Sequence, residues 1–227
     1  MTPAPGPEGF GDLSLQDFLD RLASGEPVPG GGSAAAVAGS LAAALVAMVA
    51  TLSKDRPRYA DHATLHAWGQ VTGRHLAGEL LALADEDADA YGVLAAAMKL
   101  PRETEPQKAE RLNAMRAAAR TATEVPLRCV AAARNVLRAT EALAGRSNVN
   151  AASDLSVATL LAEAAARGAA ANVLINLPAV ADDSYADETR GRVTRLLAET
   201  EQLAHETRRV VETGEARPPH VPGTELA

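Results

Sequence analysis

One carboxylate, Asp87, interrupts an otherwise small and apolar helical stripe. The stripe has a member at every third or fourth position: Leu80, Ala84, Asp87, Tyr91, Leu94 and Met98. A carboxylate on a core-facing stripe costs free energy unless it is paired or used in chemistry. Burial would raise the pKa of Asp87 toward neutral pH, which suits a general base. The alternative is a structural ion pair with an Arg or Lys from another helix.

A glycine-rich turn lies directly before an expected helix. Gly30, Gly31 and Gly32 would let the backbone approach a ligand closely, and Ser33 can cap the helix that follows. Free N–H groups at a helix start favour an anion. The turn matches neither GxxxxGK[ST] nor a GxGxxG fingerprint, and a flexible turn with an ordinary cap is the simpler interpretation.

Several amide side chains stand in apolar surroundings. Asn172 and Asn176 are four residues apart in the run AAANVLINLP, so they share a helix face. Asn148, Asn150 and Asp154 gather around the preceding loop. Buried amides need hydrogen-bond partners, and a ligand with amide-like edges would supply them. Helix capping by the loop group and interhelical bonds by the two helical amides are the alternatives.

Other chemistries have weaker support. His62 and His66 are four residues apart, but the chain has neither HExxH nor a Glu-x-x-His pair, so we expect no metal site and both histidines facing solvent. The single cysteine, Cys129, excludes an internal disulfide, and its apolar neighbours indicate an inert core position.

The elements that position these residues are predicted to be helices. Ala makes up roughly a fifth of the chain and aromatic residues only 3%, which favours an all-α fold over a β-sheet fold. Periodicity predicts helices over six segments: 14–24, 33–53, 61–100, 104–144, 153–176 and 184–213. Pro126 should kink the fourth, and Pro178 should end the fifth. We expect a bundle of five or six helices, two of them long, without a sheet. A single domain would cover 13–213, with flexible tails at 1–12 and 214–227.

Charge and hydropathy exclude several partners. The net charge of −7 and the pI near 5.3 argue against binding to nucleic acid or to an anionic membrane. Residues 33–53 carry no charge and are about long enough to span a bilayer, but they are mostly Ala, Gly and Ser, without an aromatic belt. We expect this segment to be a buried helix that meets other helices or a second subunit. No signal peptide is visible, so the expected compartment is the cytoplasm.

Taken in order, the motifs resemble those of the cyclodeaminase/cyclohydrolase family of folate enzymes. This family includes the cyclodeaminase domain of formiminotransferase-cyclodeaminase and stand-alone methenyltetrahydrofolate cyclohydrolases. The resemblance covers about residues 13–210 and rests on LSLQDFLDRLA, PGGGSAAA, DEDADAY followed by AMKLP, VPL at 125–127, the segment 148–154 and NVLINL at 172–177. The chain departs from the family at Ser147, where Gly is more usual. The basic residues of the turn LSKDRPRYADH (Lys54, Arg56 and Arg58) cannot be matched one by one.

The resemblance implies a helical homodimer that binds a tetrahydrofolate derivative as substrate, without a metal or another cofactor. It places the family's catalytic aspartate on Asp87. The expected substrate-binding residues are Gly30, Gly31, Gly32, Ser33, Asn148, Asp154, Asn172 and Asn176. The implied reaction is either cyclodeamination of formiminotetrahydrofolate or hydrolysis of methenyltetrahydrofolate. A non-catalytic folate-binding or scaffold protein with the same fold is the alternative.

Overall fold

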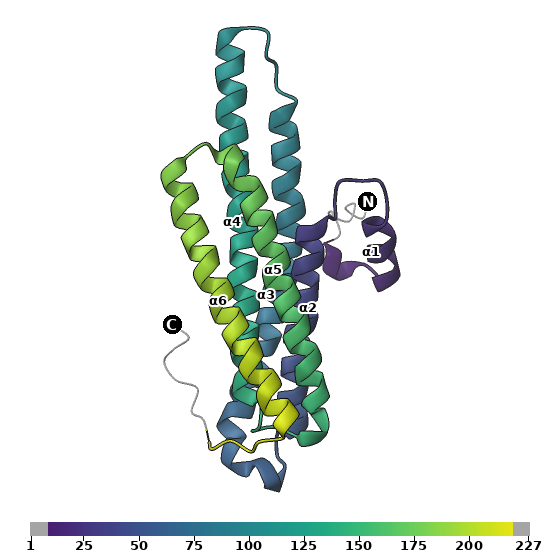
Figure 1. Cartoon of the computed structure of the whole chain (residues 1–227). Coiled ribbons are helices and arrows are strands. Elements are labelled where there is room, and N and C mark those ends of the chain that lie inside the picture. The colour runs from purple at the N-terminus through teal and green to yellow at the C-terminus, as the bar shows by residue number, and fades with distance from the viewer. Residues whose placement is uncertain (1–8, 220–227) are drawn as a thin grey trace.

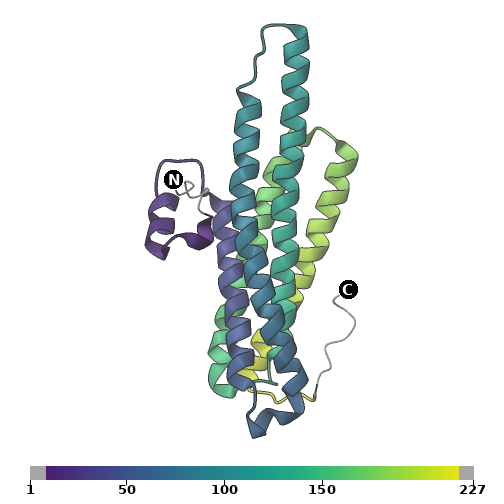
Figure 2. The same cartoon turned by 180° about the vertical axis from the view of Figure 1, so that it is seen from behind.

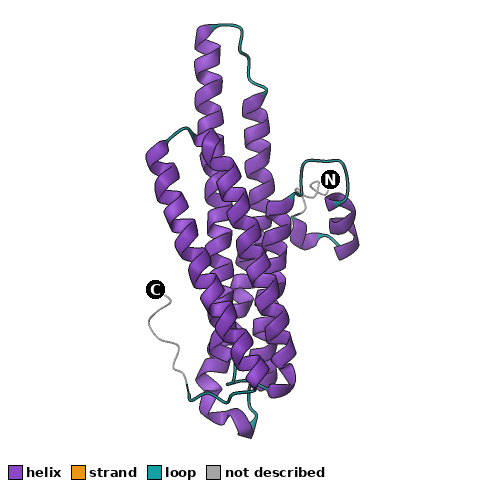
Figure 3. Cartoon of the chain, viewed as in Figure 1, coloured by secondary structure: helices purple, strands orange, loops and turns teal. Residues whose placement is uncertain are grey.

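Long helices running alternately up and down form the body of the molecule (Figure 1). The computed structural model describes residues 9–219. After the short α1 (Leu15–Leu22), the helices are α2 (Gly31–Ser53), α3 (Ala63–Met98), α4 (Glu105–Leu143), α5 (Ala152–Val180) and α6 (Asp183–Thr213). Three short 3-10 helices occur at Phe10–Asp12, Pro57–His62 and Val149–Ala151. No strand occurs within the described residues, and the predicted all-α bundle is confirmed (Figure 3).

Four helices surround the core and a fifth covers one side. α2 and α4 each pack against both α3 and α5, and α6 packs against α4 and α5. The view from behind shows α2, α3 and α4 side by side, with α6 at the edge (Figure 2). The largest fully buried side chains include Leu80, Leu137, Leu155 and Leu177. Small residues fill most remaining core positions, so the helices approach one another closely.

Side-chain caps set the starts of α1, α4 and α6. Ser14 and Asp182 accept hydrogen bonds from backbone N–H groups in the first turns of α1 and α6. Thr104 forms a capping box with Gln107 at the start of α4. The start of α2 differs, because its N-cap is Gly30, which has no side chain to accept a bond.

The two internal prolines do not end their helices. α4 continues through Pro126 from Glu105 to Leu143. α5 continues past Pro178 to Val180, so the predicted end at 176 is wrong. Leu177 and Val180 are both buried, and their packing holds the last turn although one backbone hydrogen bond is lost.

Both chain ends make defined contacts where the structure describes them. The Phe10 N–H donates to Asp85 Oδ1 over 2.7 Å. At the other end of the bundle, the Arg217 N–H donates to the Gly145 carbonyl oxygen over 3.0 Å. The remainder of the predicted tails, 1–8 and 220–227, lies outside the described residues.

Two helical segments, α2 and 149–180, are long and apolar enough to cross a membrane by length and composition alone. Half of the most apolar part of α2, and 44% of that part of 149–180, is buried inside the bundle. Packing within the bundle therefore accounts for much of this apolar character.

Candidate functional site

The carboxylate of Asp87 lies against the first turn of α2. The Ser33 hydroxyl is 3.0 Å from the Ala84 carbonyl oxygen and 3.1 Å from Asp87 Oδ2, so it can donate to either. The Ser33 backbone N–H also bonds the Asp87 side chain. Asp87 thus caps α2 from a neighbouring helix, in place of the side chain that Gly30 lacks.

The glycine turn is what allows this approach. A Cβ atom at Gly32 would overlap both carboxylate oxygens of Asp87, whereas a Cβ at Gly31 would meet nothing within 4 Å. Neither residue has a positive φ. The anion at the start of α2 in this structure is the protein's own Asp87, and all three glycines of the turn line the cleft beside it.

Burial and hydrogen bonding act on Asp87 in opposite directions. Burial raises the pKa of Asp87, and the two hydrogen bonds from Ser33 lower it, with burial the larger effect. None of the ion pairs among residues 9–219 includes Asp87. The structural alternative, an ion pair with Arg or Lys, is not what the structure shows. A half-buried carboxylate with a raised pKa and access to a cleft is suited to accept a proton.

Asp87 opens into a cleft of about 210 Å³ between the glycine turn, α3, α4 and α5. The stripe on α3 is buried at Leu80 and Ala84, and from Asp87 onward it lines this cleft with Tyr91 and Leu94. The full lining is Pro27, Val28, Gly30, Gly31, Gly32, Asp87, Tyr91, Leu94, Ala122, Asn172 and Asn176. Sequence reasoning did not assign Tyr91 and Leu94 to the site, although their spacing from Asp87 carried the signal.

Asn172 and Asn176 line the cleft, and the amide nitrogen of each donates to a backbone carbonyl oxygen. Asn176 Nδ2 donates to the Ala122 carbonyl oxygen over 2.7 Å. This carbonyl has no helical donor because Pro126, four residues later, lacks an N–H. Asn172 Nδ2 donates to the Gly168 carbonyl oxygen over 2.9 Å. Each amide is therefore oriented by its nitrogen, and its oxygen remains available as an acceptor.

The structure does not bring Asn148 and Asp154 to this cleft. The Asn148 N–H donates to Ser53 Oγ over 2.8 Å, at the last residue of α2, whereas the cleft lies at its first residues. The length of α2 separates them by roughly 30 Å within one chain. Asn148 Oδ1 accepts from the Asn150 N–H over 3.2 Å, and Asp154 lies in the first turn of α5. Asn148 therefore caps the 3-10 helix Val149–Ala151, and Asp154 is an acidic residue at the positive end of the α5 dipole.

The remaining candidates do not join the cleft lining. Cys129 is buried, and burial together with the charges of Asp87 and Glu79 raises its pKa to about 12. The expectation that both histidines face solvent is wrong, because His66 is 1% exposed and His62 is half-buried. Among residues 9–219, no three His, Cys, Asp or Glu side chains are grouped to hold a metal ion.

Comparison with known proteins finds matches within one family. A family model described as formiminotransferase-cyclodeaminase matches residues 14–195. The methenyltetrahydrofolate cyclohydrolase of Methylorubrum extorquens is 36% identical over 193 residues, which cover 85% of this chain and 93% of that protein. The formimidoyltransferase-cyclodeaminase of Rattus norvegicus is 34% identical over 206 residues, or 90% of this chain and 38% of that protein.

A solved structure supports the same assignment of fold. The crystal structure of formiminotetrahydrofolate cyclodeaminase from Thermotoga maritima matches with a TM-score of 0.81 and 27% sequence identity. The match covers 89% of this chain and 98% of that one.

Proposed function

The chain belongs to the formiminotransferase-cyclodeaminase family, and from this premise we propose that it acts on the one-carbon unit carried between N5 and N10 of tetrahydrofolate, with Asp87 as general base. The observation that carries the proposal is the placement of Asp87. Its carboxylate has no cationic partner, has a raised pKa and opens into a cleft. The chain spans 38% of the length of the rat relative, so the transferase activity in that relative's name is not assigned to it.

As a cyclodeaminase, the site would close a ring on formiminotetrahydrofolate. N10 attacks the formimino carbon attached to N5, and Asp87 takes the N10 proton. The formimino nitrogen, which is protonated at the outset, receives this proton from Asp87 and leaves as ammonia, and the carbon then bridges N5 and N10 in a cationic methenyl group. The anionic form of Asp87 stabilises the positive charge that develops on this carbon.

As a cyclohydrolase, the same carboxylate would activate water. Water attacks the methenyl carbon and Asp87 accepts one of its protons. N5 takes that proton from Asp87 as its bond to the carbon breaks, the remaining hydroxyl proton is released to solvent, and 10-formyltetrahydrofolate is left. Both reactions need a base beside the same carbon and pass through a similar charge distribution. The amide oxygens of Asn172 and Asn176 would accept hydrogen bonds from the N–H groups of the pterin ring.

Paired absorbance assays for methenyltetrahydrofolate test the proposal. A cyclodeaminase produces this chromophore from formiminotetrahydrofolate, and a cyclohydrolase consumes it faster than the uncatalysed reaction. Asp87→Asn is the control and should abolish the enzymatic rate in either assay. If neither substrate reacts while folinic acid still raises the melting temperature, the chain is the non-catalytic folate-binding alternative.

The chain is also proposed to form a homodimer through an apolar face on α2 and α5. Leu41 and Leu52 on α2 are 54% and 42% exposed, and Leu160 and Ile175 on α5 are 60% and 76% exposed. The two helices are neighbours in the bundle, so these side chains belong to adjoining surfaces. Exposed apolar side chains of this size on neighbouring helices are typical of a surface that is covered by a partner.

Light scattering after gel filtration measures the oligomeric state. The double variant Leu41→Arg/Leu160→Arg should be a monomer with helical content retained. Leu112→Arg, at an exposed leucine on α4, should remain a dimer. A wild-type monomer at micromolar concentration would refute the dimer.

A further inference from the structure

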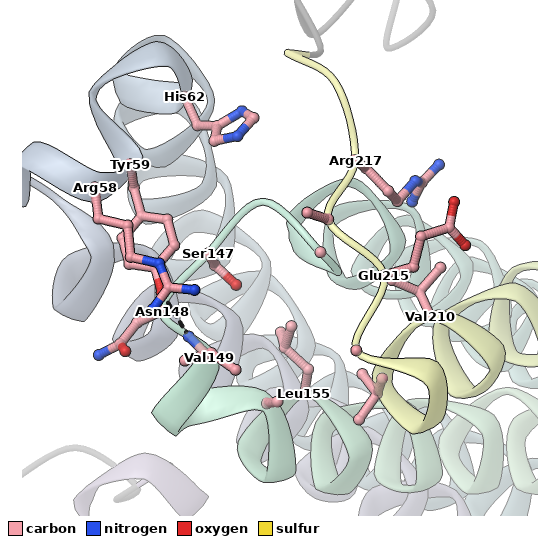
Figure 4. A pocket seen from close by; sticks show the side chains of 15 residues that line it. Arg58, Tyr59, His62, Ser147, Asn148, Val149, Leu155, Val210, Glu215 and Arg217 are labelled. Atoms are coloured by element: carbon pink, nitrogen blue, oxygen red, sulfur yellow. Dashed lines mark hydrogen bonds between the residues drawn. The ribbon is translucent and has the colours of Figure 1, made fainter.

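A second cavity, of about 200 Å³, lies at the end of the bundle away from the Asp87 cleft (Figure 4). Its walls come from the 3-10 helix Pro57–His62, the loop 145–149, the first turns of α5, the last turn of α6 and the segment 214–217. We call it the far-end cavity. It belongs to one chain and lies roughly 30 Å from the cleft, at the C-terminal end of α2.

Two polar groups in the cavity wall have no hydrogen-bond partner within residues 9–219, and one of them, His62 Nδ1, is fully buried. Ser147 is 8% exposed, and its hydroxyl forms no hydrogen bond within the described part of the chain. His62 Nδ1 is buried and likewise has no hydrogen-bond partner. Figure 4 shows the Ser147 hydroxyl and the His62 ring directed toward the open space between the 3-10 helix Pro57–His62 and the segment 214–217. Unsatisfied buried polar groups are costly, and a ligand atom would satisfy them.

The charged side chains in the cavity wall are Arg58, Arg217 and Glu215. Arg58 lies with its guanidinium 5.6 Å from the centre of the Tyr59 ring, and none of the ion pairs among residues 9–219 includes it. The nearby buried Arg146 donates only to carbonyl oxygens, at Ala142 over 3.0 Å and Pro218 over 2.7 Å.

The other charges nearby are mostly neutralised. Arg217 pairs with Glu141 over 2.6 Å, and Glu215 pairs with Arg209 over 2.6 Å. The negative charge of Asp61 lies close enough to His62 to raise its pKa, against the larger lowering by burial. Arg209 is shared with Glu206, so these charges nearly balance, and Arg58 is the lining cation that is left to attract an anion.

The rest of the lining is apolar and limits the size of a ligand. Val149, Leu155 and Val210 form much of the wall. A cavity of about 150 Å³ lined by apolar side chains holds a benzene ring. A volume of about 200 Å³ therefore has room for a ring-sized apolar body with one charged group attached.

We propose that the far-end cavity is a second ligand site, for a small carboxylate with an apolar body. The carboxylate accepts hydrogen bonds from Arg58 and the Ser147 hydroxyl, and the body packs against Leu155 and Val210. The site requires no step of the folate chemistry and stands independently of it.

Benzoate is a suitable probe, and benzyl alcohol is its uncharged counterpart. We expect saturable benzoate binding to the full-length protein in a titration followed by NMR, and weaker binding of benzyl alcohol. Arg58→Gln should weaken benzoate binding about fivefold, because one charge-assisted contact is lost. The matched control is Arg56→Gln, an exposed arginine outside the cavity lining, which should change the Kd less than about twofold.

Three results would overturn the proposal. The first is the absence of saturable binding to the wild type. The second is equal weakening by Arg58→Gln and Arg56→Gln, which would mean that benzoate senses only the general positive charge. The third is loss of binding in Asp87→Asn, which would place benzoate in the Asp87 cleft. Ser147→Ala, with its folding checked by thermal melting, should weaken binding in the same direction as Arg58→Gln.

Discussion

Asp87 takes the place of an N-cap side chain at the start of α2. In this position two opposing effects act on the pKa of its carboxyl group. The first-turn N–H groups and the Ser33 hydroxyl favour the carboxylate, while burial favours the neutral acid. The carboxyl group is therefore held firmly in place, yet its proton affinity is raised. Both properties are needed by a general base that must keep its position while it gains and loses a proton.

Replacing Asp87 by Asn should separate catalysis from stability. The amide cannot accept the proton, so we expect turnover to fall by roughly 100- to 10,000-fold. The folded state raises the pKa of Asp87, so ionisation costs folding free energy as the pH rises from the unfolded to the folded pKa. At a pH above the folded pKa, Asp87→Asn should therefore leave the free energy of unfolding unchanged or increase it. Steady-state kinetics and thermal melting at several pH values measure both effects.

The wild-type rate should also fall as the pH decreases through the raised pKa of Asp87, because the base is then protonated. If Asp87→Asn unfolds while its activity per folded molecule is intact, the catalytic role of Asp87 is contradicted. Asp87 would then be a structural cap of α2.

Gly32→Ala should move the carboxylate without removing it. The new Cβ would overlap the Asp87 oxygens, so the side chain must rotate away from Ser33. We expect a loss in kcat of at least tenfold, since misplaced catalytic groups lose rate steeply. Gly31→Ala is the matched control, because its Cβ meets nothing within 4 Å and it should keep most of the activity. Equal losses in both variants would mean that the turn acts only through its flexibility.

The choice of Asp87 as the candidate base was possible from the sequence, but its surroundings were not predictable. Asp87 was found because a charge interrupts an apolar period on one helix. Its contact with Gly32 and Ser33 joins residues more than fifty positions apart, and no local pattern encodes that distance. For the same reason the sequence did not predict that Tyr91 and Leu94 line the cleft. Their spacing places them on the same helix face as Asp87, but the cleft is formed by residues of other helices.

At the scale of elements, a proline in α4 orients an amide on α5. Pro126 leaves the Ala122 carbonyl free, and Asn176 takes the vacant position over 2.7 Å. The two helices are thereby linked by a side chain that also lines the cleft. The proline is thus a positioning residue for Asn176.

Pro126→Ala should weaken this link. Alanine restores an N–H that can donate to Ala122, and Asn176 must then compete for the same oxygen. We expect KM to rise several-fold with kcat little changed, and stability to hold or increase because a helix-interior proline is costly. Asn176→Ala is the reference, and the double variant should add little to it. Additive effects of the two changes would show that Pro126 does not act through Asn176.

Helix positions were predicted well because periodicity is a local signal, and the six observed α-helices lie close to the six expected segments. The errors arose where packing overrides a local rule. Pro178 was expected to end α5, but the burial of Leu177 and Val180 carries the helix onward. His66 was expected in solvent, but its Nε2 lies 2.9 Å from the Arg146 carbonyl oxygen across the bundle.

At the scale of the whole molecule, the segment after α6 crosses the end of the bundle and binds the α4–α5 loop. Arg217 donates to Gly145, and Arg146 donates to Pro218. Gly145 has a φ of 72°, and a Cβ there would overlap the Glu215 carbonyl oxygen. The crossing therefore depends on glycine at this position for both its conformation and its space.

Gly145→Ala should destabilise the protein more than Gly214→Ala. Both glycines have positive φ, which costs alanine about 1 kcal/mol, but a Cβ at Gly214 meets nothing within 4 Å. The additional overlap at Gly145 should lower the free energy of unfolding by about 1–3 kcal/mol more. Urea denaturation of the two variants measures the difference. Equal destabilisation would show that the segment moves aside freely.

The separation of Asn148 and Asp154 from Asp87 is also a property of the whole molecule. Their residue types suited a folate site, and their motif lay in the expected order along the chain. Only the up-and-down path shows that the loop before α5 lies at the opposite end of α2 from the cleft. Sequence order therefore indicates the family of this chain but not which of its motifs meet in space.

The ends of α3 and α4 rise beyond α5 and α6, as Figure 1 shows, and none of residues 105–117 is buried. Amide hydrogens in this extension should exchange with deuterium by local opening, whereas those of 122–143 should require opening of the core. We expect exchange followed by mass spectrometry to show protection rising steeply along α4 toward its C-terminal half. Uniform protection along α4 would show that the extension opens only with the core.

Because Tyr91 and Leu94 lie where the extension begins, one wall of the cleft would fluctuate more often than the floor that holds Asp87. Substrate would then enter past this more mobile wall while the Asp87 carboxylate keeps its position.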